Sequence, residues 1–143
     1  MLNSRPGGRS EVREDLPVFN LSVFINSGGG VYYMQTAGLV TSETQAAAFD
    51  NKGPRWISGF RLMADQPVPA IRSLSVEPCV SLDDGATYTP VGNLGVVLSD
   101  QRRGEALLPP NSLFLLPDKA LVVYRLTLTK NWKGFLTSTL YLY

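Results

Sequence analysis

Short segments of alternating apolar and polar residues recur along the chain, and turn-forming Gly, Pro, Asn and Asp residues separate them. The apolar positions are rich in Val, Ile, Phe and Tyr, which favour extended backbone on a half-buried sheet. This alternation predicts β-strands. We expect strands at residues 16–25, 31–36, 55–63, 71–80, 94–98, 112–116, 120–129 and 134–143.

The last of these segments has the clearest period of two. Successive side chains of a strand point to opposite faces of the sheet. The sequence therefore places Phe135, Thr137, Thr139 and Tyr141 on one face, and Leu136, Ser138, Leu140 and Leu142 on the other.

Pro78 lies inside the predicted strand 71–80. Proline has no N–H to donate, so it is confined to edge strands and bulges. We therefore expect this strand to lie at an edge or to bulge at Pro78. Cys79 follows directly in the same apolar segment, which predicts a buried and inert thiol.

Glycine-rich and polar segments predict the connections between strands. Gly28-Gly29-Gly30 separates the first two predicted strands, which indicates a hairpin with a loose turn. The polar segment 130–134 likewise predicts a hairpin tip. On such a tip Trp132 and Lys133 are candidates for contact with a partner.

The segment 41–51, TSETQAAAFDN, is the exception to the alternation. Ser42 and Gln45 have the spacing of a capping box, and the three alanines that follow favour helix. The alternative is a strand through Ala46 and Ala48. Both alternatives stand at this point.

No segment has a helical period long enough for a β-α-β unit. About eight or nine short strands separated by turn signals are typical of a β-sandwich or a barrel. We expect an all-β fold, a single jelly-roll-like β-sandwich with at most one short helix. It divides into an extended N-terminal arm, residues 1–15, and one β-sandwich domain, residues 16–143.

Composition removes much catalytic chemistry, because the 143-residue chain has no histidine and one cysteine. Ser-His-Asp and Cys-His arrangements and His-ligated metal sites are therefore excluded within the chain, and Cys79 has no partner for an intrachain disulfide. Paired carboxylates of the glycosidase kind remain, but most of the 12 acidic residues lie in predicted turns or in the arm. We expect no enzymatic activity and no cofactor.

Charge is low and balanced, with 13 basic and 12 acidic residues. Charged residues make up 17% of the chain, below the usual quarter or so, and such a surface is weakly defended against association. The balance gives no bias toward nucleic acid. In the arm, Arg5, Arg9 and Arg13 are candidates for contact with a partner protein, with nucleic acid as the less favoured alternative.

No apolar run reaches the roughly 18 residues that a membrane helix needs. The polar N-terminal segment also lacks the apolar stretch of a signal peptide. We therefore expect synthesis in the cytoplasm and no membrane partner, and a single cysteine fits a reducing compartment.

Residues 81–88, SLDDGATY, fit the pattern Ser-x-Asp-x-Gly-x-Thr-aromatic. This pattern resembles the Asp-box turn of sialidase-type propellers. In such a turn the Asp accepts backbone N–H groups and the Gly takes a positive φ. We assign Ser81, Asp83, Gly85, Thr87 and Tyr88 to a stabilising hairpin turn. Calcium binding by Asp83 and Asp84 is the alternative, as a weak metal-site candidate.

Two tryptophans and six tyrosines allow two interpretations. Gathered on one face they would form a platform on which sugars stack, and otherwise they pack in the core and at interfaces. These residues are Trp56, Trp132, Tyr32, Tyr33, Tyr88, Tyr124, Tyr141 and Tyr143. Because the last predicted strand runs to the final residue, Tyr141 and Tyr143 are further candidates for contact with a partner.

Four segments together carry a family resemblance. They are Thr41–Gln45 (TSETQ), Arg55–Leu62 (RWISGFRL), the strand 71–80 leading into the turn Asp83–Tyr88, and Tyr124–Thr129 (YRLTLT). Their order over residues 40–130 is similar to that of small β-sandwich virion structural proteins of tailed bacteriophages. The chain departs from that pattern at Asp83–Thr87, where it has the Asp-box form.

The resemblance implies a structural protein of a tailed-phage virion, made in the host cytoplasm. It would serve as a capsid decoration or cement subunit, with a neck or tail component as the alternative. Its partners would be the major capsid protein or other virion proteins, and no catalytic residues carry over. Closed symmetry makes a homo-oligomer, a dimer or trimer, the expected state. The aromatic residues keep a carbohydrate- or receptor-binding module as the competing function.

Overall fold

The structure is a computed structural model that describes residues 16–143, with side chains described from Phe19 onward. The predicted arm, residues 1–15, and its contact candidates Arg5, Arg9 and Arg13 lie outside the described residues. Strands are the dominant regular elements of the described chain, so the all-β prediction is confirmed. Two single-turn 3-10 helices, η1 (Glu43–Gln45) and η2 (Ala70–Arg72), are its only helical elements.

Twelve strands are formed in the described residues. They are β1 (Leu16–Ser27), β2 (Gly30–Gln35), β3 (Gly38–Val40), β4 (Phe49–Asp50), β5 (Arg55–Ala64), β6 (Leu74–Ser81), β7 (Thr89–Pro90), β8 (Val96–Leu98), β9 (Arg103–Leu107), β10 (Phe114–Leu116), β11 (Leu121–Leu128) and β12 (Trp132–Leu142). The count exceeds the expected eight or nine because several strands have only two or three residues.

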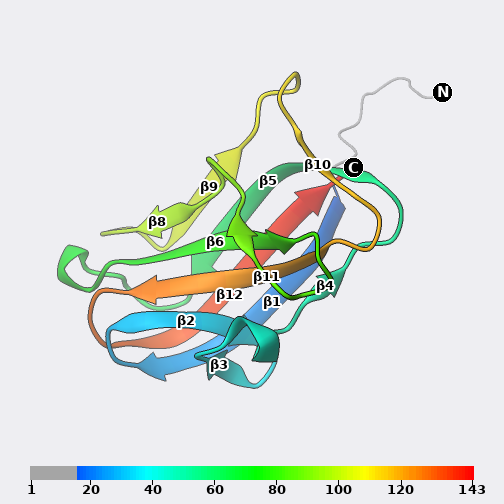
Figure 1. The fold of residues 1–143 in the computed structure, drawn as a ribbon. Helices are drawn as coiled ribbons and strands as arrows, with labels where there is room; N and C mark the ends of the chain where they lie inside the picture. The colour runs from blue at the N-terminus through cyan, green and yellow to red at the C-terminus, as the bar shows by residue number, and fades with distance from the viewer. Residues whose placement is uncertain (1–15) are drawn as a thin grey trace.

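The strands pair antiparallel in two sheets that face each other (Figure 1). The first sheet has the order β1-β12-β5-β10, with β9 also on β5. The second has the order β3-β2-β11-β6-β7, with β4 on β11 and β8 on β6. Several neighbouring strands come from distant parts of the sequence, such as β1 and β12 or β2 and β11, as the jelly-roll-like prediction requires.

Neither alternative for residues 41–51 is formed as predicted, because the helix is a single 3-10 turn that ends before the three alanines and Ala46–Ala48 belong to no strand. Ser42 begins η1, where its hydroxyl accepts the N–H of Thr44 at 3.3 Å. The chain then extends, and Phe49 and Asp50 form β4 opposite Val122 and Leu121 of β11. Neither element exceeds one turn or two residues.

Both predicted hairpins are wrong, because each connection passes from one sheet to the other. β1 belongs to the first sheet and β2 to the second, so the glycine loop 28–30 is a crossover. β11 and β12 are separated in the same way, and 130–134 is no hairpin tip.

Trp132 is consequently not an exposed contact. Its side chain is 4% exposed, and the indole Nε1 donates to the carbonyl oxygen of Pro67 at 2.9 Å. The crossover turns Trp132 inward because it begins the strand whose alternate residues line the core. Lys133, next in the sequence, is exposed.

Pro78 occupies an interior strand, which corrects the prediction of an edge or bulge. β6 lies between β11 on one side and β7 and β8 on the other. β8 pairs with residues 74–76 and β7 with residues 79–80, which leaves a gap at Pro78. The Pro78 carbonyl points to that side, where it accepts the N–H of Val91 at 3.0 Å. The missing N–H therefore falls where no ladder partner exists.

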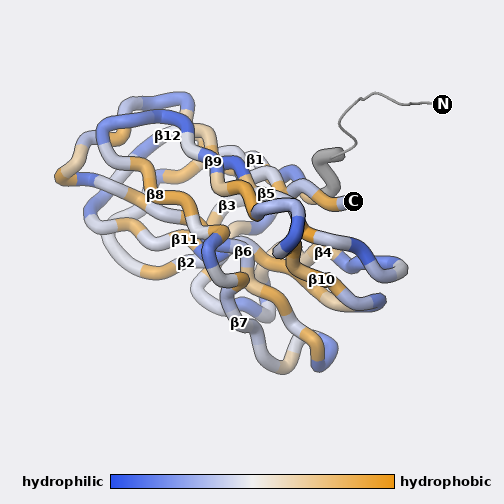
Figure 2. The backbone as a smooth tube through the Cα atoms, turned by 90° about the horizontal axis from the view of Figure 1, so that it is seen from above, coloured by the Kyte–Doolittle hydropathy of each residue, from blue (hydrophilic) through white to orange (hydrophobic). Residues whose placement is uncertain are grey.

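The core lies between the two sheets, and every second residue of the strands contributes its side chain to it. Figure 2 shows hydrophobic stretches along the strands and mainly hydrophilic loops. The face of β12 on which the sequence places Leu136, Ser138, Leu140 and Leu142 is the inner one, because all four residues are buried. At the centre Tyr124 stacks on Phe19 with ring centroids 4.4 Å apart, and its hydroxyl donates to the Phe19 carbonyl at 2.5 Å. This contact ties β11 of the second sheet to β1 of the first.

Candidate functional site

The turn between β6 and β7 is a closed hydrogen-bonded unit. Asp83 Oδ1 accepts the Ser81 hydroxyl at 2.8 Å and the Thr87 N–H at 2.9 Å, and its Oδ2 accepts the Thr87 hydroxyl at 2.6 Å. The Ser81 hydroxyl oxygen in turn accepts the N–H of Gly85 at 2.8 Å. Gly85 has a φ of 88°, and the half-buried Tyr88 lies behind it. The five assigned residues thus come together as one turn.

Both oxygens of the Asp83 carboxylate accept hydrogen bonds within this turn. The hydrogen bonds from Thr87 and then Ser81 lower the pKa of Asp83 from 3.8 to about 2. Asp84 has a φ of 59° and its side chain is exposed. Within residues 16–143, no group of three or more Cys, Asp or Glu side chains has an arrangement that holds a metal ion. The geometry is that of a folding device.

We predict that Asp83 makes stability depend on acid pH. A carboxylate whose folded pKa is about 2 contributes stability that is fully present above its ordinary value of 3.8 and is lost as the pH falls through 2. Urea unfolding of the wild type and of Asp83→Asn should therefore differ most above about pH 5 and converge toward pH 2. Asp84→Asn keeps every hydrogen bond of the turn and is the matched control. A constant difference across this pH range would contradict the assignment.

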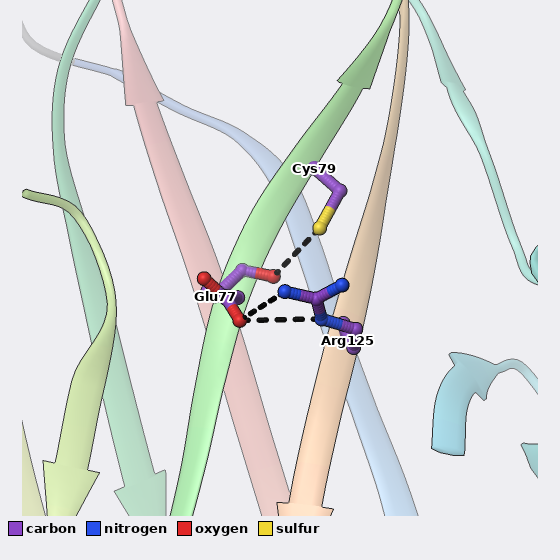
Figure 3. Close-up of polar contacts among 3 residues, drawn as sticks. All are labelled: Glu77, Cys79 and Arg125. Atoms are coloured by element: carbon purple, nitrogen blue, oxygen red, sulfur yellow. Dashed lines mark hydrogen bonds and ion pairs between the residues drawn. The ribbon is translucent and has the colours of Figure 1, made fainter. Parts of the chain in front are cut away.

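A polar cluster lies on the outer side of the second sheet (Figure 3). Arg125 of β11 donates from Nη2 and Nε to Glu77 Oε2 of β6, at 2.6 and 3.2 Å. The two residues are directly opposite in the register, and their side chains are about one third exposed. The hydrogen bond that Arg125 donates to Glu77 raises the pKa of Arg125. The pair links two neighbouring strands, and each charged group is engaged by the other.

Cys79 lies next to this pair, is 1% exposed and forms no disulfide. Burial raises the pKa of its thiol to about 11, although Arg125 opposes the shift. The charges of Glu77 and Glu43 add to the shift. The thiol is protonated near neutral pH and is a poor nucleophile. The inert thiol expected from the sequence matches this environment.

A hollow at one end of the sandwich gathers Asp50, Asp84 and Asp118 together with Lys52 and Lys119. Asp118 Oδ1 is engaged by the backbone N–H of Gly53 at 2.7 Å. Two lysines among the acids give the hollow mixed charge.

The outer face of the first sheet carries most of the exposed large hydrophobic side chains of the described chain. Six of the ten large hydrophobic residues that are exposed lie on it, at 44–65% exposure. We call these six the apolar face: Phe24, Trp56, Leu107, Leu115, Phe135 and Tyr143. The register forms two groups at opposite ends of the sheet, because Leu115 lies opposite Trp56 at one end and Phe24 lies opposite Phe135 at the other.

Polar and charged residues lie between the two ends of the apolar face. Arg61 of β5 lies opposite Thr139 on one side and Glu105 on the other. Its guanidinium carbon is 5.7 Å from the ring centroid of Tyr141. An apolar surface with interspersed polar groups is the usual composition of a protein interface.

Only part of this surface was predicted from the sequence. Of the eight aromatic residues, Trp56, Tyr141 and Tyr143 lie on it or beside it, whereas Tyr124 and Trp132 are buried. Phe24, Leu107 and Leu115 were not among the predicted contacts. Alternation along a strand determines which side chains point outward once it is known which face of that strand is buried. The sequence alone does not say which face that is, so these residues were not predicted.

Comparisons with known proteins assign no family. No protein-family model matches the chain, and no curated protein matches its sequence. Among solved structures it is similar to the Eiger TNF from S. frugiperda, at 8% identity over 87% of this chain and 92% of that chain, with a TM-score of 0.37. A likeness this distant carries no argument about function. None of the helices in residues 16–143 is long and apolar enough to cross a membrane.

Proposed function

We propose that the chain is a structural protein of a tailed-bacteriophage virion, a capsid decoration or cement subunit that works as a homo-oligomer. The observation that supports this function best is the apolar face on the first sheet. At about half exposure, each of its six side chains presents on the order of 100 Å². Together they supply most of the roughly 800 Å² that each partner contributes to a standard protein interface.

Burial of this face against neighbouring shell subunits would stabilise the shell without any chemical step. Apolar burial contributes about 25 cal/mol for each Å² removed from water. The low charge of the chain, 17% of its residues, lowers the cost of desolvating the surrounding surface. A neck or tail component would use the same face in the same way.

The test is co-sedimentation of the purified chain with shells, necks and tails prepared from the phage that encodes it. We expect the wild type to sediment with one of these particles. Trp56→Glu combined with Leu115→Glu should weaken binding by at least about tenfold, because each glutamate would have to be desolvated. Val97→Glu is the matched control, since Val97 is 58% exposed on the second sheet. Failure of the wild type to bind any particle would overturn the proposal.

A carbohydrate- or receptor-binding module is the second candidate. It is favoured by Trp56 and Tyr143, which lie side by side at one end of the apolar face, where the Tyr143 N–H donates to the Trp56 carbonyl at 3.0 Å. Flat exposed rings of this kind stack on sugars. Binding to a glycan array that is lost in Trp56→Ala would favour this function, and an array without signal would remove it.

A further inference from the structure

β1 forms one edge of the first sheet. It pairs with β12 from Leu16 to Ser27, and no other described strand pairs with it. A strand with one neighbour has a row of backbone N–H and C=O groups on its other side.

Phe135 of β12 shows the direction of these groups. Its N–H donates to Asp65 Oδ1 at 2.8 Å, and its carbonyl accepts the Asp65 N–H at 3.1 Å, so both groups point away from β1. Phe24 lies directly opposite Phe135. Opposite residues of an antiparallel pair either exchange both hydrogen bonds or exchange none. The N–H and C=O of Phe24 therefore point to the open edge.

Alternation extends this result to Ser22 and Asn26, two residues away on either side. Among the described residues, no hydrogen bond engages the backbone N–H or C=O of these three residues. All three residues are exposed. The open edge therefore has a run of unpaired donors and acceptors at the spacing of a β-ladder.

The other sheet edges in residues 16–143 have features that block pairing. β3, β8 and β10 have three residues each, and β7 has two, one of which is Pro90. β9 has five residues, including Arg103 and Glu105. β1 has twelve residues and none is charged. Natural proteins protect edge strands by shortness, charge or proline, and past Pro17 β1 has none of these.

We propose that β1 pairs antiparallel with β1 of a second copy of this chain, about a twofold axis at Phe24. A twofold axis presents the same edge to itself, so every unpaired group meets its complement. Phe24 then lies opposite Phe24 of the partner subunit, and Ser22 lies opposite Asn26 of the partner subunit. The two first sheets become one continuous sheet across the dimer.

The aromatic side chains favour this register over its neighbours. Phe24 packs on Phe135 with ring centroids 5.3 Å apart, and both rings are about half exposed. With the axis at Phe24, the pair meets its own copy and four rings come together. Cross-strand aromatic pairs stabilise antiparallel ladders. The dimer deepens the homo-oligomer part of the proposed function and does not depend on a virion partner.

The first test measures the mass of the full chain in solution by sedimentation equilibrium. We expect a dimer. Ser22→Lys should weaken it by at least about tenfold, because both copies would place a charge on the shared edge. Thr137→Lys is the matched control: the Thr137 and Ser22 hydroxyls share a 2.9 Å hydrogen bond, and Thr137 lies on the interior strand β12. A monomeric wild type, or equal loss in both variants, would overturn the proposal.

The second test fixes the register by disulfide formation under mild oxidation. Opposite residues of a hydrogen-bonded pair have Cα atoms about 5.5 Å apart, which is within disulfide range. Phe24→Cys should therefore form a covalent dimer, and Ser22→Cys should not, because Ser22 lies far from its own copy. Cys79 is buried and does not compete. Cross-linking of Ser22→Cys but not of Phe24→Cys would contradict the axis. A virion-binding failure would leave both results unchanged.

Discussion

Replacing Phe60 with alanine is expected to lower the free energy of unfolding by about 3–5 kcal/mol. Phe60 is fully buried on β5, and its ring centroid is 5.4 Å from that of Tyr124. Tyr124 belongs to the opposite sheet and itself bonds to Phe19 of β1. Loss of the Phe60 ring therefore leaves a cavity where the two sheets meet, and stiff neighbouring strands limit how far it can collapse.

Equilibrium urea unfolding, followed by tryptophan fluorescence and circular dichroism, measures this change. Val97→Ala is the matched control, because Val97 is 58% exposed on the second sheet and lies outside the apolar face. Its loss should cost less than about 1 kcal/mol. A similar loss in the two variants would mean that Phe60 is not at the centre of the core.

The sequence predicts the strands well because alternation is a local signal. In β12, Leu136 and Leu140 are buried as expected, while Phe135 on the opposite face is half exposed. The connections failed because loop composition does not say which strand the chain joins next. Gly28 and its neighbours suit a loose hairpin and a crossover between sheets equally well, and only the tertiary pairing decides.

The same contrast separates the two polar sites. The turn at Asp83 was predictable because every partner lies within four residues along the chain. Glu77 and Arg125 are 48 residues apart, so no spacing rule connects them. Trp132 looked exposed because lysines flank it, but its partner Pro67 is 65 residues away. Long-range contacts of this kind decide burial, and a single sequence does not show them.

Asn51 is the strongest example of a site that the sequence analysis missed. Its side chain is fully buried, and Nδ2 lies within hydrogen-bond distance of three carbonyl oxygens: those of Gly53 at 2.8 Å, Leu116 at 3.1 Å and Pro117 at 2.8 Å. The Asn51 backbone adds two more bonds, to Ala120 and Lys119. One residue thus joins the chain after β4 to the turn between β10 and β11.

Asn51→Ala is expected to lower the free energy of unfolding by about 2–4 kcal/mol, since carbonyls left buried without a donor cost about 1–3 kcal/mol each. Part of that cost is recovered where water reaches the Gly53 carbonyl. Asn131→Ala, at an exposed position, is the control and should change little. Hydrogen exchange gives a second readout, because the Lys119 N–H bonds to the Asn51 carbonyl at 2.7 Å and should lose protection as the turn loosens. Unchanged stability together with unchanged protection at Lys119 would show that the backbone bonds alone hold the turn, and that the buried amide is dispensable.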